Sequence, residues 1–239
     1  MVFQINGQKT KILNYYKWER KLIMDKILLP SMMCANFADL ANEVKKLEEA
    51  NVSGYHIDIM DGQFVPNFGM GLQDLEVIRK NTKKLVDVHL MIDNPEKHID
   101  LFAKMGVDII YIHPESDIHP AKTLQTIKQK NIKAGIAINP GTSIDTIKPL
   151  LHIIDYIMVM TVNPGFAGQK YLDYVDYKIE ELLEDSFKSQ FNYAVFVDGA
   201  ISPERIDKLS TMGVQGFVLG TSSLFNKKKD YKTIINSLR

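Results

Sequence analysis

From residue 26 onward the chain repeats one pattern, and this repetition constrains its fold more than any other feature. A short run of β-branched and other apolar residues is followed by a few Gly, Pro, Asn or Asp residues, and then by a longer stretch with helical spacing. The pattern predicts strands that alternate with helices. Eight strands are expected, at residues 27–30, 54–60, 85–91, 109–113, 133–138, 156–162, 193–198 and 216–220.

Helices are predicted between these strands, for example at residues 37–50, 95–105, 121–130 and 203–212. In the first of them Leu40, Val44 and Leu47 share one face, and Ser202 precedes the last as an N-cap with Pro203 at the first helical position. The connections are short and the strands are apolar on both faces. These two properties indicate a parallel sheet that is covered by helices.

Eight such units over residues 26–239 predict an α/β fold of the (β/α)8 TIM-barrel type, which takes about 250 residues. We expect this range to form a single catalytic domain. An open doubly wound sheet is the alternative, although no glycine-rich dinucleotide fingerprint follows the first strand. Residues 1–25, which include Trp18, are expected to form an N-terminal extension packed on the barrel, or alternatively a subunit contact.

Composition excludes several classes of partner. The 239 residues contain 29 Lys and Arg and 29 Asp and Glu, so no global basic field is available for nucleic acid or an anionic membrane. The single cysteine, Cys34, excludes an intrachain disulfide and favours a reducing compartment, by default the cytoplasm. Neither a secretory signal nor an apolar stretch of about 20 residues is recognisable, and we expect no membrane segment.

Polar residues with metal-binding chemistry lie on the second and third predicted strands and at the end of the seventh, and a barrel of this kind has its active site at the carboxyl ends of its strands. His56 and Asp58 are two residues apart and therefore share a face, with His89 on the neighbouring strand and Asp198 across the barrel mouth. The four residues predict one divalent Zn, Fe, Mn or Co ion per subunit. A lone strand histidine is more often a core residue, and the prediction rests on the whole set. His98, His119 and His152 are expected to be solvated.

Glycine-containing turns at three successive strand ends predict a phosphate site. Residues 163–169 (NPGFAGQ) form a loop with two glycines, and Gly199 and Gly220 follow the seventh and eighth strands. A barrel often binds phosphate at this place through backbone amides, beside the amino terminus of a short helix. A neutral chain could bind a phosphorylated ligand in this way. The alternative is that these glycines only turn the chain.

These stretches resemble the ribulose-phosphate 3-epimerase family over almost the whole chain from residue 27 to residue 225. The resemblance is carried by residues 30–31 (PS), 56–67 (HIDIMDGQFVPN), 87–91 (DVHLM), 159–169 (VMTVNPGFAGQ), 197–199 (VDG) and 220–222 (GTS). It implies an isomerase that epimerises carbon 3 of a ketose phosphate, such as ribulose 5-phosphate, through a metal-stabilised ene-diolate. It also implies a homo-oligomer.

By this resemblance Asp58 is the proton acceptor and Asp198 the proton donor in one direction, and both are metal ligands together with His56 and His89. Two bases are needed because inversion removes a proton from one face of carbon 3 and returns one to the other. The resemblance further implies that the substrate is bound by Ser31, His89, Met33, Met60, Met91, Met160, Gly165, Phe166, Ala167, Gly168, Gly199, Ala200, Gly220 and Thr221.

Some positions depart from the family or favour one of its branches. Asn36 and Asn163 stand where acidic residues are usual, and residues 68–72 lack a common proline-containing segment. Ala167, residues 113–115 and residues 220–225 look more similar to the branch that epimerises allulose 6-phosphate. The related decarboxylase and aldolase barrels carry D-x-K-x-x-D on the third strand, whereas this chain has His89 in place of the lysine. A barrel that binds a sugar phosphate without catalysis is the remaining alternative.

Overall fold

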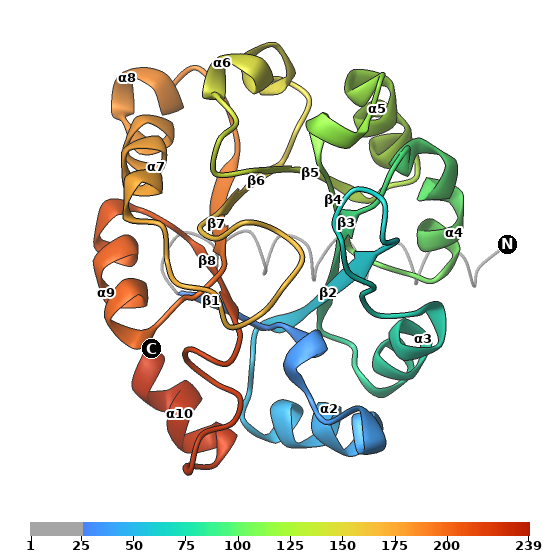
Figure 1. Cartoon of the computed structure of the whole chain (residues 1–239), viewed down its shortest axis with the longest axis vertical. Helices are drawn as coiled ribbons and strands as arrows, with labels where there is room; N and C mark the ends of the chain where they lie inside the picture. The colour runs from blue at the N-terminus through green and yellow to red at the C-terminus, as the bar shows by residue number, and fades with distance from the viewer. Residues whose placement is uncertain (1–25) are drawn as a thin grey trace, which may run out of the picture.

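The computed structural model describes residues 26–239, and the predicted packing of residues 1–25 lies outside that range. Eight parallel strands form one sheet in the order β1-β8-β7-β6-β5-β4-β3-β2. A parallel bridge between Ser31 and His56 joins the end of β1 to β2 and closes the ring. The predicted α/β barrel is therefore present, and Figure 1 shows its strands in the centre with helices around them.

The strands agree with the predicted ranges to within two residues, because each apolar run ends at turn-forming or polar residues. They are β1 Ile27–Pro30, β2 Gly54–Met60, β3 Leu85–Met91, β4 Ile109–Ile112, β5 Lys133–Ile138, β6 Tyr156–Met160, β7 Ala194–Asp198 and β8 Gly216–Leu219. The differences are at the ends of four strands: His113, Thr161, Val162 and Gly220 follow their strands, and Tyr193 precedes β7.

The helices lie between the strands in sequence, except for the last one, which follows β8. The α-helices are α2 Leu40–Glu49, α3 Leu72–Asn81, α4 Ile99–Lys104, α5 Pro120–Gln129, α6 Ile144–Ile147, α7 Asp176–Leu183, α8 Asp185–Lys188, α9 Pro203–Met212 and α10 Tyr231–Leu238. Short 3-10 turns occur at η1 Met32–Cys34, η2 Phe37–Asp39, η3 Pro95–His98, η4 Pro114–Ser116, η5 Lys148–Leu150 and η6 Asp173–Val175. Two predicted helices, 37–50 and 95–105, thus each begin with a 3-10 turn. The Ser202 cap is confirmed, since its side chain accepts a hydrogen bond from the Arg205 amide.

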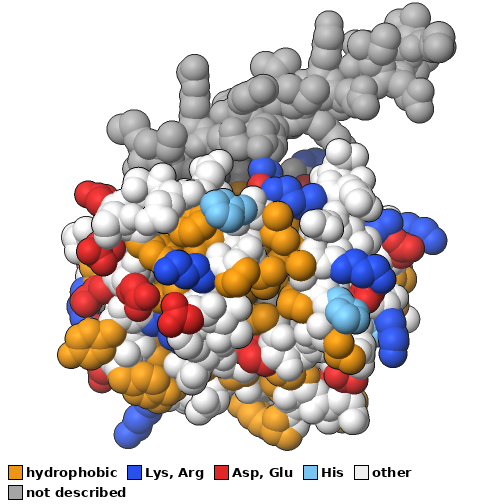
Figure 2. Space-filling model, turned by 90° about the horizontal axis from the view of Figure 1, so that it is seen from above, with side chains coloured by type: hydrophobic (Ala, Val, Ile, Leu, Met, Phe, Trp, Pro, Cys, Tyr) orange, Lys and Arg blue, Asp and Glu red, His pale blue; other side chains and the backbone are white. Residues whose placement is uncertain are grey.

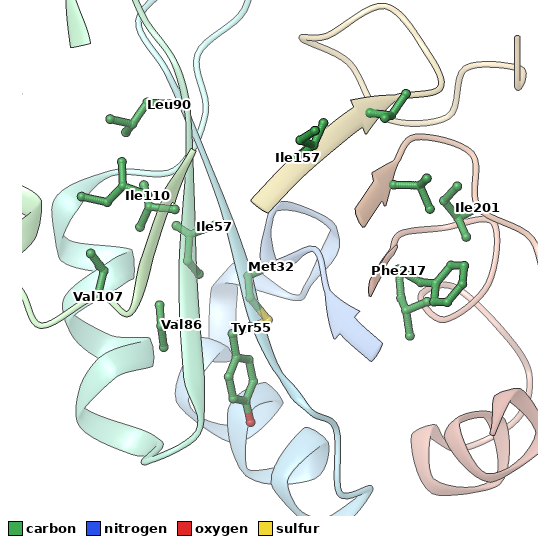
Figure 3. Packing of buried hydrophobic residues seen from close by; sticks show 14 of the residues in the cluster. Met32, Tyr55, Ile57, Val86, Leu90, Val107, Ile110, Ile157, Ile201 and Phe217 are labelled. Atoms are coloured by element: carbon green, nitrogen blue, oxygen red, sulfur yellow. The ribbon is translucent and has the colours of Figure 1, made fainter. Parts of the chain in front are cut away.

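Two apolar layers hold the barrel together. The larger layer fills the space between strands and helices, and Figure 3 shows part of it, including Ile57, Val86 and Phe217. The predicted face of α2, formed by Leu40, Val44 and Leu47, belongs to this layer. The second layer fills the barrel interior, where the rings of Tyr156 and Phe196 meet edge to face at 5.1 Å. The interior is therefore packed and closes the barrel below its mouth.

The aromatic side chains inside the barrel need glycine on the neighbouring strands. A Cβ atom at Gly135 would lie 2.3 Å from Cδ1 of the buried Tyr111. We therefore expect Gly135→Ala to lower the free energy of unfolding by about 1–3 kcal/mol through overpacking. The midpoint of thermal unfolding should fall by about 2–4 °C for each kcal/mol. Gly141→Ala is the matched control, because no atom lies within 4 Å of its added Cβ. Equal midpoints for the two variants would contradict this account of the interior.

Charges are dispersed on the visible surface. The face in Figure 2 carries acidic, basic and hydrophobic side chains interspersed, with no large area of one sign. This agrees with the formal net charge of zero. Within residues 26–239, the helices are too short or too polar to cross a membrane.

Candidate active site

The sheet register brings the four predicted metal ligands together at the carboxyl ends of the strands. Asp58 on β2 is paired with His89 on β3, and Asp198 is the last residue of β7. The candidate ligand atoms of His56, Asp58, His89 and Asp198 all lie within 4.8 Å of one another. Residues separated by 142 positions in the chain, from 56 to 198, thus form one cluster.

The spacing and chemistry of these donors fit a divalent transition ion. Asp58 Oδ1 lies 3.2 Å from His56 Nε2 and 3.5 Å from His89 Nδ1. Asp198 Oδ2 lies 4.0 Å and 3.9 Å from the same two nitrogen atoms. Donors about 2.1 Å from a common tetrahedral ion are about 3.4 Å apart, close to these values. His89 Nδ1 is buried and accepts no hydrogen bond, which is the state that a metal ligand requires.

Two neighbouring side chains orient the cluster. Asp87, directly beside His56 in the register, lies 2.5 Å from His56 Nδ1 through Oδ1, so that His56 Nε2 faces the carboxylates. Ser31 donates its hydroxyl proton to Asp58 Oδ2 at 2.8 Å. The sequence reasoning did not give Asp87 a role. Its position two residues before His89, on the same face of β3, is the signal that could have found it.

The two carboxyl groups differ in their protonation in the absence of a cation. Burial works against ionisation of Asp58, but the charge and hydrogen bond of His56 outweigh it and hold the pKa well below its usual range. Burial and then the nearby Asp58 charge raise the pKa of Asp198 to about 7. A divalent cation favours the ionised form of both groups. Pairs of acids with separated pKa values are typical of sites that transfer protons.

The two histidines differ as well. Burial lowers the pKa of His56, but Asp87 and Asp58 together raise it well above the ordinary histidine value. The pKa of His89 is lowered, with burial as the main cause. His98, His119 and His152 are exposed, as predicted, and lie outside the cluster. The cluster therefore contains two of the six histidines of the chain.

A pocket opens above the cluster and reaches Asp58 and Asp198. Its volume, with the open mouth included, is about 550 Å³. Every residue predicted to bind substrate lines it except His89, which is fully buried. The predicted lining residues are Ser31, Met33, Met60, Met91, Met160, Gly165, Phe166, Ala167, Gly168, Gly199, Ala200, Gly220 and Thr221.

Sequence reasoning missed other residues of the pocket wall. Cys34, Val162, Ile201, Val218 and Ser222 also line it. Cys34 belongs to the 3-10 turn that follows β1, and a search of every residue after a strand end would have found it. Burial raises the pKa of its thiol to about 11, so that it acts as a small apolar group in the wall.

Methionine side chains cover one side of the pocket. Met60 and Met91 pack with Val65, and Met33 and Phe64 lie against them. Thioether side chains are apolar and adapt to irregular shapes. They exclude water from the space next to the two carboxyl groups. Met33, Met60, Met91 and Met160 thus pack against other apolar side chains of the barrel and also face the pocket.

Two loops meet over the pocket. The segment after β6 lies over the middle of the barrel in Figure 1, and the Asn67 side chain in the segment after β2 donates to the Gly165 carbonyl at 2.6 Å. Within the segment after β6, the Gln169 side chain donates to the backbone carbonyl groups of Asn163 and Phe166 and so stabilises the loop. The two loops therefore form a connected cover.

The predicted phosphate end of the pocket has an unusual backbone. Gly199 has φ of +117°, and an added Cβ would lie 2.5 Å from Val162 Cγ2, so no other residue fits there. Ala200 follows in the left-handed region with φ of +53°. The prediction of a short helix near this end is wrong for the segment after β8. Residues 221–226 form turns, with the Leu224 amide donating to the Gly220 carbonyl at 3.0 Å.

Comparison with known proteins agrees with this geometry. The model of the ribulose-phosphate 3-epimerase family matches residues 27–225. That span contains all eight strands and every residue of the cluster and pocket. The matched range is also the range over which the motifs of the sequence carry their resemblance.

Curated relatives are similar over most of the chain. The chain is 38% identical over 212 residues to ribulose-phosphate 3-epimerase of Bacillus subtilis, covering 88% of this chain and 96% of the relative. It is 38% identical over 217 residues to the chloroplastic ribulose-5-phosphate-3-epimerase of Arabidopsis thaliana, covering 90% and 76%. Among solved structures, KGPDC from Streptococcus mutans is similar with a TM-score of 0.67 and 14% identity, covering 90% of this chain and 96% of that one. This last similarity supports the barrel fold alone.

Proposed function

The chain belongs to the ribulose-phosphate 3-epimerase family, and from this premise we propose that it is an isomerase that interconverts ribulose 5-phosphate and its carbon 3 epimer, xylulose 5-phosphate. The observation that carries the proposal is the pair of carboxyl groups, Asp58 and Asp198, which both reach the floor of one pocket. They come from β2 and β7, which are separated by β1 and β8 in the ring. They can thus approach a bound sugar from different sides.

The proposed chemistry is a proton transfer on each face of carbon 3. Asp58 accepts the proton on one face, and Asp198 donates a proton to the opposite face, with the roles exchanged in the reverse direction. Ser31 fixes the Asp58 carboxylate through its hydrogen bond. The methionine wall excludes water and so prevents stray protonation of the intermediate anion. Inversion follows because donor and acceptor are different residues.

We propose one divalent ion per subunit, bound by His56, Asp58, His89 and Asp198. The ion would supply Lewis-acid stabilisation of the negative charge that develops on the substrate when the proton leaves. Zn, Fe, Mn and Co all suit two imidazoles and two carboxylates. The substrate phosphate is proposed to bind at Gly199, Ala200, Gly220 and Thr221, below the loop of residues 163–169.

The hexose alternative is weaker than the pentose proposal. Ala167, residues 113–115 and residues 220–225 favour the branch that acts on allulose 6-phosphate, but they are few positions. The curated relatives described above are named for ribulose phosphate, and they match most of the chain. The comparisons therefore do not favour the hexose substrate.

Proton NMR in D2O tests the function directly. The protein is loaded with Zn, Mn, Fe or Co and mixed with ribulose 5-phosphate and, separately, with allulose 6-phosphate. We expect deuterium to enter carbon 3 of ribulose 5-phosphate together with formation of its epimer, faster than with the hexose. A faster reaction with allulose 6-phosphate would assign the protein to the branch that epimerises this hexose phosphate. Binding of both sugars without exchange would identify a non-catalytic sugar-phosphate barrel.

The contact between Asn67 and Gly165 gives a second test. We expect Asn67→Ala to raise the KM for ribulose 5-phosphate about 2- to 10-fold, the effect of one lost hydrogen bond of about 0.5–1.5 kcal/mol. The loop that covers the pocket loses its connection to the β2 segment in this variant. Asn81→Ala is the control, because Asn81 makes a similar side-chain contact to the Val77 carbonyl on α3. A KM unchanged from wild type would show that the connection does not affect substrate binding.

The expected location and assembly are part of the same proposal. The single cysteine supports a reducing compartment, for which the cytoplasm is the default. A homo-oligomer remains a prediction, to be checked by light scattering of the purified full chain.

A further inference from the structure

A second buried histidine lies behind His89, on the side away from the carboxyl cluster. His89 Nε2 and His113 Nε2 are 2.8 Å apart, and neither side chain has exposed surface. The Phe64 ring covers His113 with a centroid distance of 4.8 Å. Two nitrogen atoms at this distance form a hydrogen bond only if one carries a proton and the other a lone pair. The contact therefore has a direction, which decides the tautomer of His89.

Glu115 sets that direction. Its Oε2 lies 3.4 Å from His113 Nδ1. Its Oε1 accepts hydrogen bonds from the Asn139 amide at 3.1 Å and from the Thr142 hydroxyl, so the carboxylate is fixed in place. An ionised carboxylate can only accept, and its charge favours a proton on the facing nitrogen. His113 then carries its proton on Nδ1 and presents a lone pair on Nε2.

The consequence reaches the metal site. A cation bound at the cluster needs the lone pair of His89 Nδ1, which lies 3.5 Å from Asp58 Oδ1 and 3.9 Å from Asp198 Oδ2, so the ring proton of His89 is then on Nε2 and is donated to His113 Nε2. We propose that Glu115 and His113 are positioning residues that hold His89 in its Nε2–H tautomer and so keep Nδ1 free to bind the metal. This inference rests on the proposed function only in naming the metal.

The arrangement around His56 supports this interpretation. There a carboxylate, Asp87, contacts Nδ1 directly and leaves Nε2 toward the cluster. The two candidate ligands therefore present opposite ring nitrogens to the cluster, and the other nitrogen of each ring faces a buried partner side chain. At His56 the carboxylate acts directly, and at His89 it acts through His113. Such partners commonly orient metal-binding histidines and raise their affinity for the ion.

Glu115→Gln reverses the chain of hydrogen bonds. The oxygen of the substituted side chain must accept from the backbone N–H of Asn139. The NH2 group of that side chain is then turned toward His113 Nδ1. His113 then carries its proton on Nε2, and His89 carries its proton on Nδ1, where the metal should bind. In Zn-loaded protein with 15N-labelled histidine, NMR should show His113 as Nδ1–H in the wild type and as Nε2–H in this variant. The affinity for Zn, measured by competition with a chelator, should fall about 10- to 100-fold.

Two further variants separate positioning from folding. His113→Gln keeps an oxygen that can accept from His89 Nε2, and should bind Zn more tightly than His113→Leu, which keeps none. Neither His113 nor Glu115 lines the pocket, so the KM for the sugar phosphate at saturating Zn should not change. Glu96→Gln is the matched control, since its carboxylate pairs with Lys122 and lies outside the cluster.

The wild-type spectrum alone can overturn the proposal, whether or not a variant folds. His113 in the Nε2–H form in the Zn-loaded wild-type protein would refute it. So would Glu115→Gln with an unchanged tautomer and unchanged Zn affinity. Failure of the wild type to bind Zn would count against the proposed metal-dependent function as well, whereas a wild type that binds Zn with an affinity that the Glu115 and His113 variants do not change would overturn this inference alone.

Discussion

Asp58→Asn and Asp198→Asn should each lower turnover by about 10²- to 10⁴-fold, the contribution of a positioned acid or base. An asparagine amide cannot exchange a proton with carbon 3 at a useful rate. It also removes one negative charge from the cluster, so metal content has to be measured for each variant. Asp100→Asn is the matched control, because Asp100 is exposed, pairs with Lys130 and lies outside the cluster.

The two variants should also differ from each other in D2O. With Asp198 replaced, Asp58 can still remove a proton from one epimer and return deuterium to the same face. With Asp58 replaced, only the other epimer should exchange. Each variant should thus wash out the carbon 3 proton of one sugar without forming its epimer. More than a tenth of wild-type turnover in either variant would refute the assignment of two bases, and exchange of both epimers by one variant would argue for a single base.

Removal of the metal should abolish turnover and destabilise the fold. In the chelated protein Asp58 and Asp198 remain close together in a buried site, with only part of their charge compensated by the histidines. Binding of an ion at about 1,000 times its Kd stabilises the folded state by about 4 kcal/mol. At about 2–4 °C for each kcal/mol, the midpoint of unfolding should rise by about 8–16 °C when the metal is restored.

The measurement is a pair of thermal scans and activity assays, before and after dialysis against a chelator, with Zn, Mn, Fe and Co added back separately. The ion that restores the highest turnover identifies the best metal. His98→Gln should respond as the wild type does, since His98 is exposed and outside the cluster. Full activity and an unchanged midpoint after chelation would contradict metal dependence.

The fold could be predicted from local patterns because each strand is a short apolar run that ends at a polar or turn-forming residue. This is why the strand ends were predicted within two residues, while the helix beginnings were less accurate. The segment 37–50 has continuous helical spacing, yet the Asn36 side chain accepts from the Ala38 amide and starts a separate 3-10 turn. Such competition between side chain and backbone at a helix start is decided by local geometry that spacing does not reveal.

The sequence by itself determined the alternation of strands and helices, the barrel, and the four polar residues at the strand ends. These follow from the period of the strands, which places His56 and Asp58 on one face, and from the common direction of parallel strands. Only the tertiary structure decided which atoms meet: the Asp87 contact to His56, the His113 contact to His89, and the Asn67 bridge to Gly165. The physical reason is that a strand pattern fixes the face of a side chain, whereas hydrogen bonds between strands and loops depend on register, ring rotation and loop path.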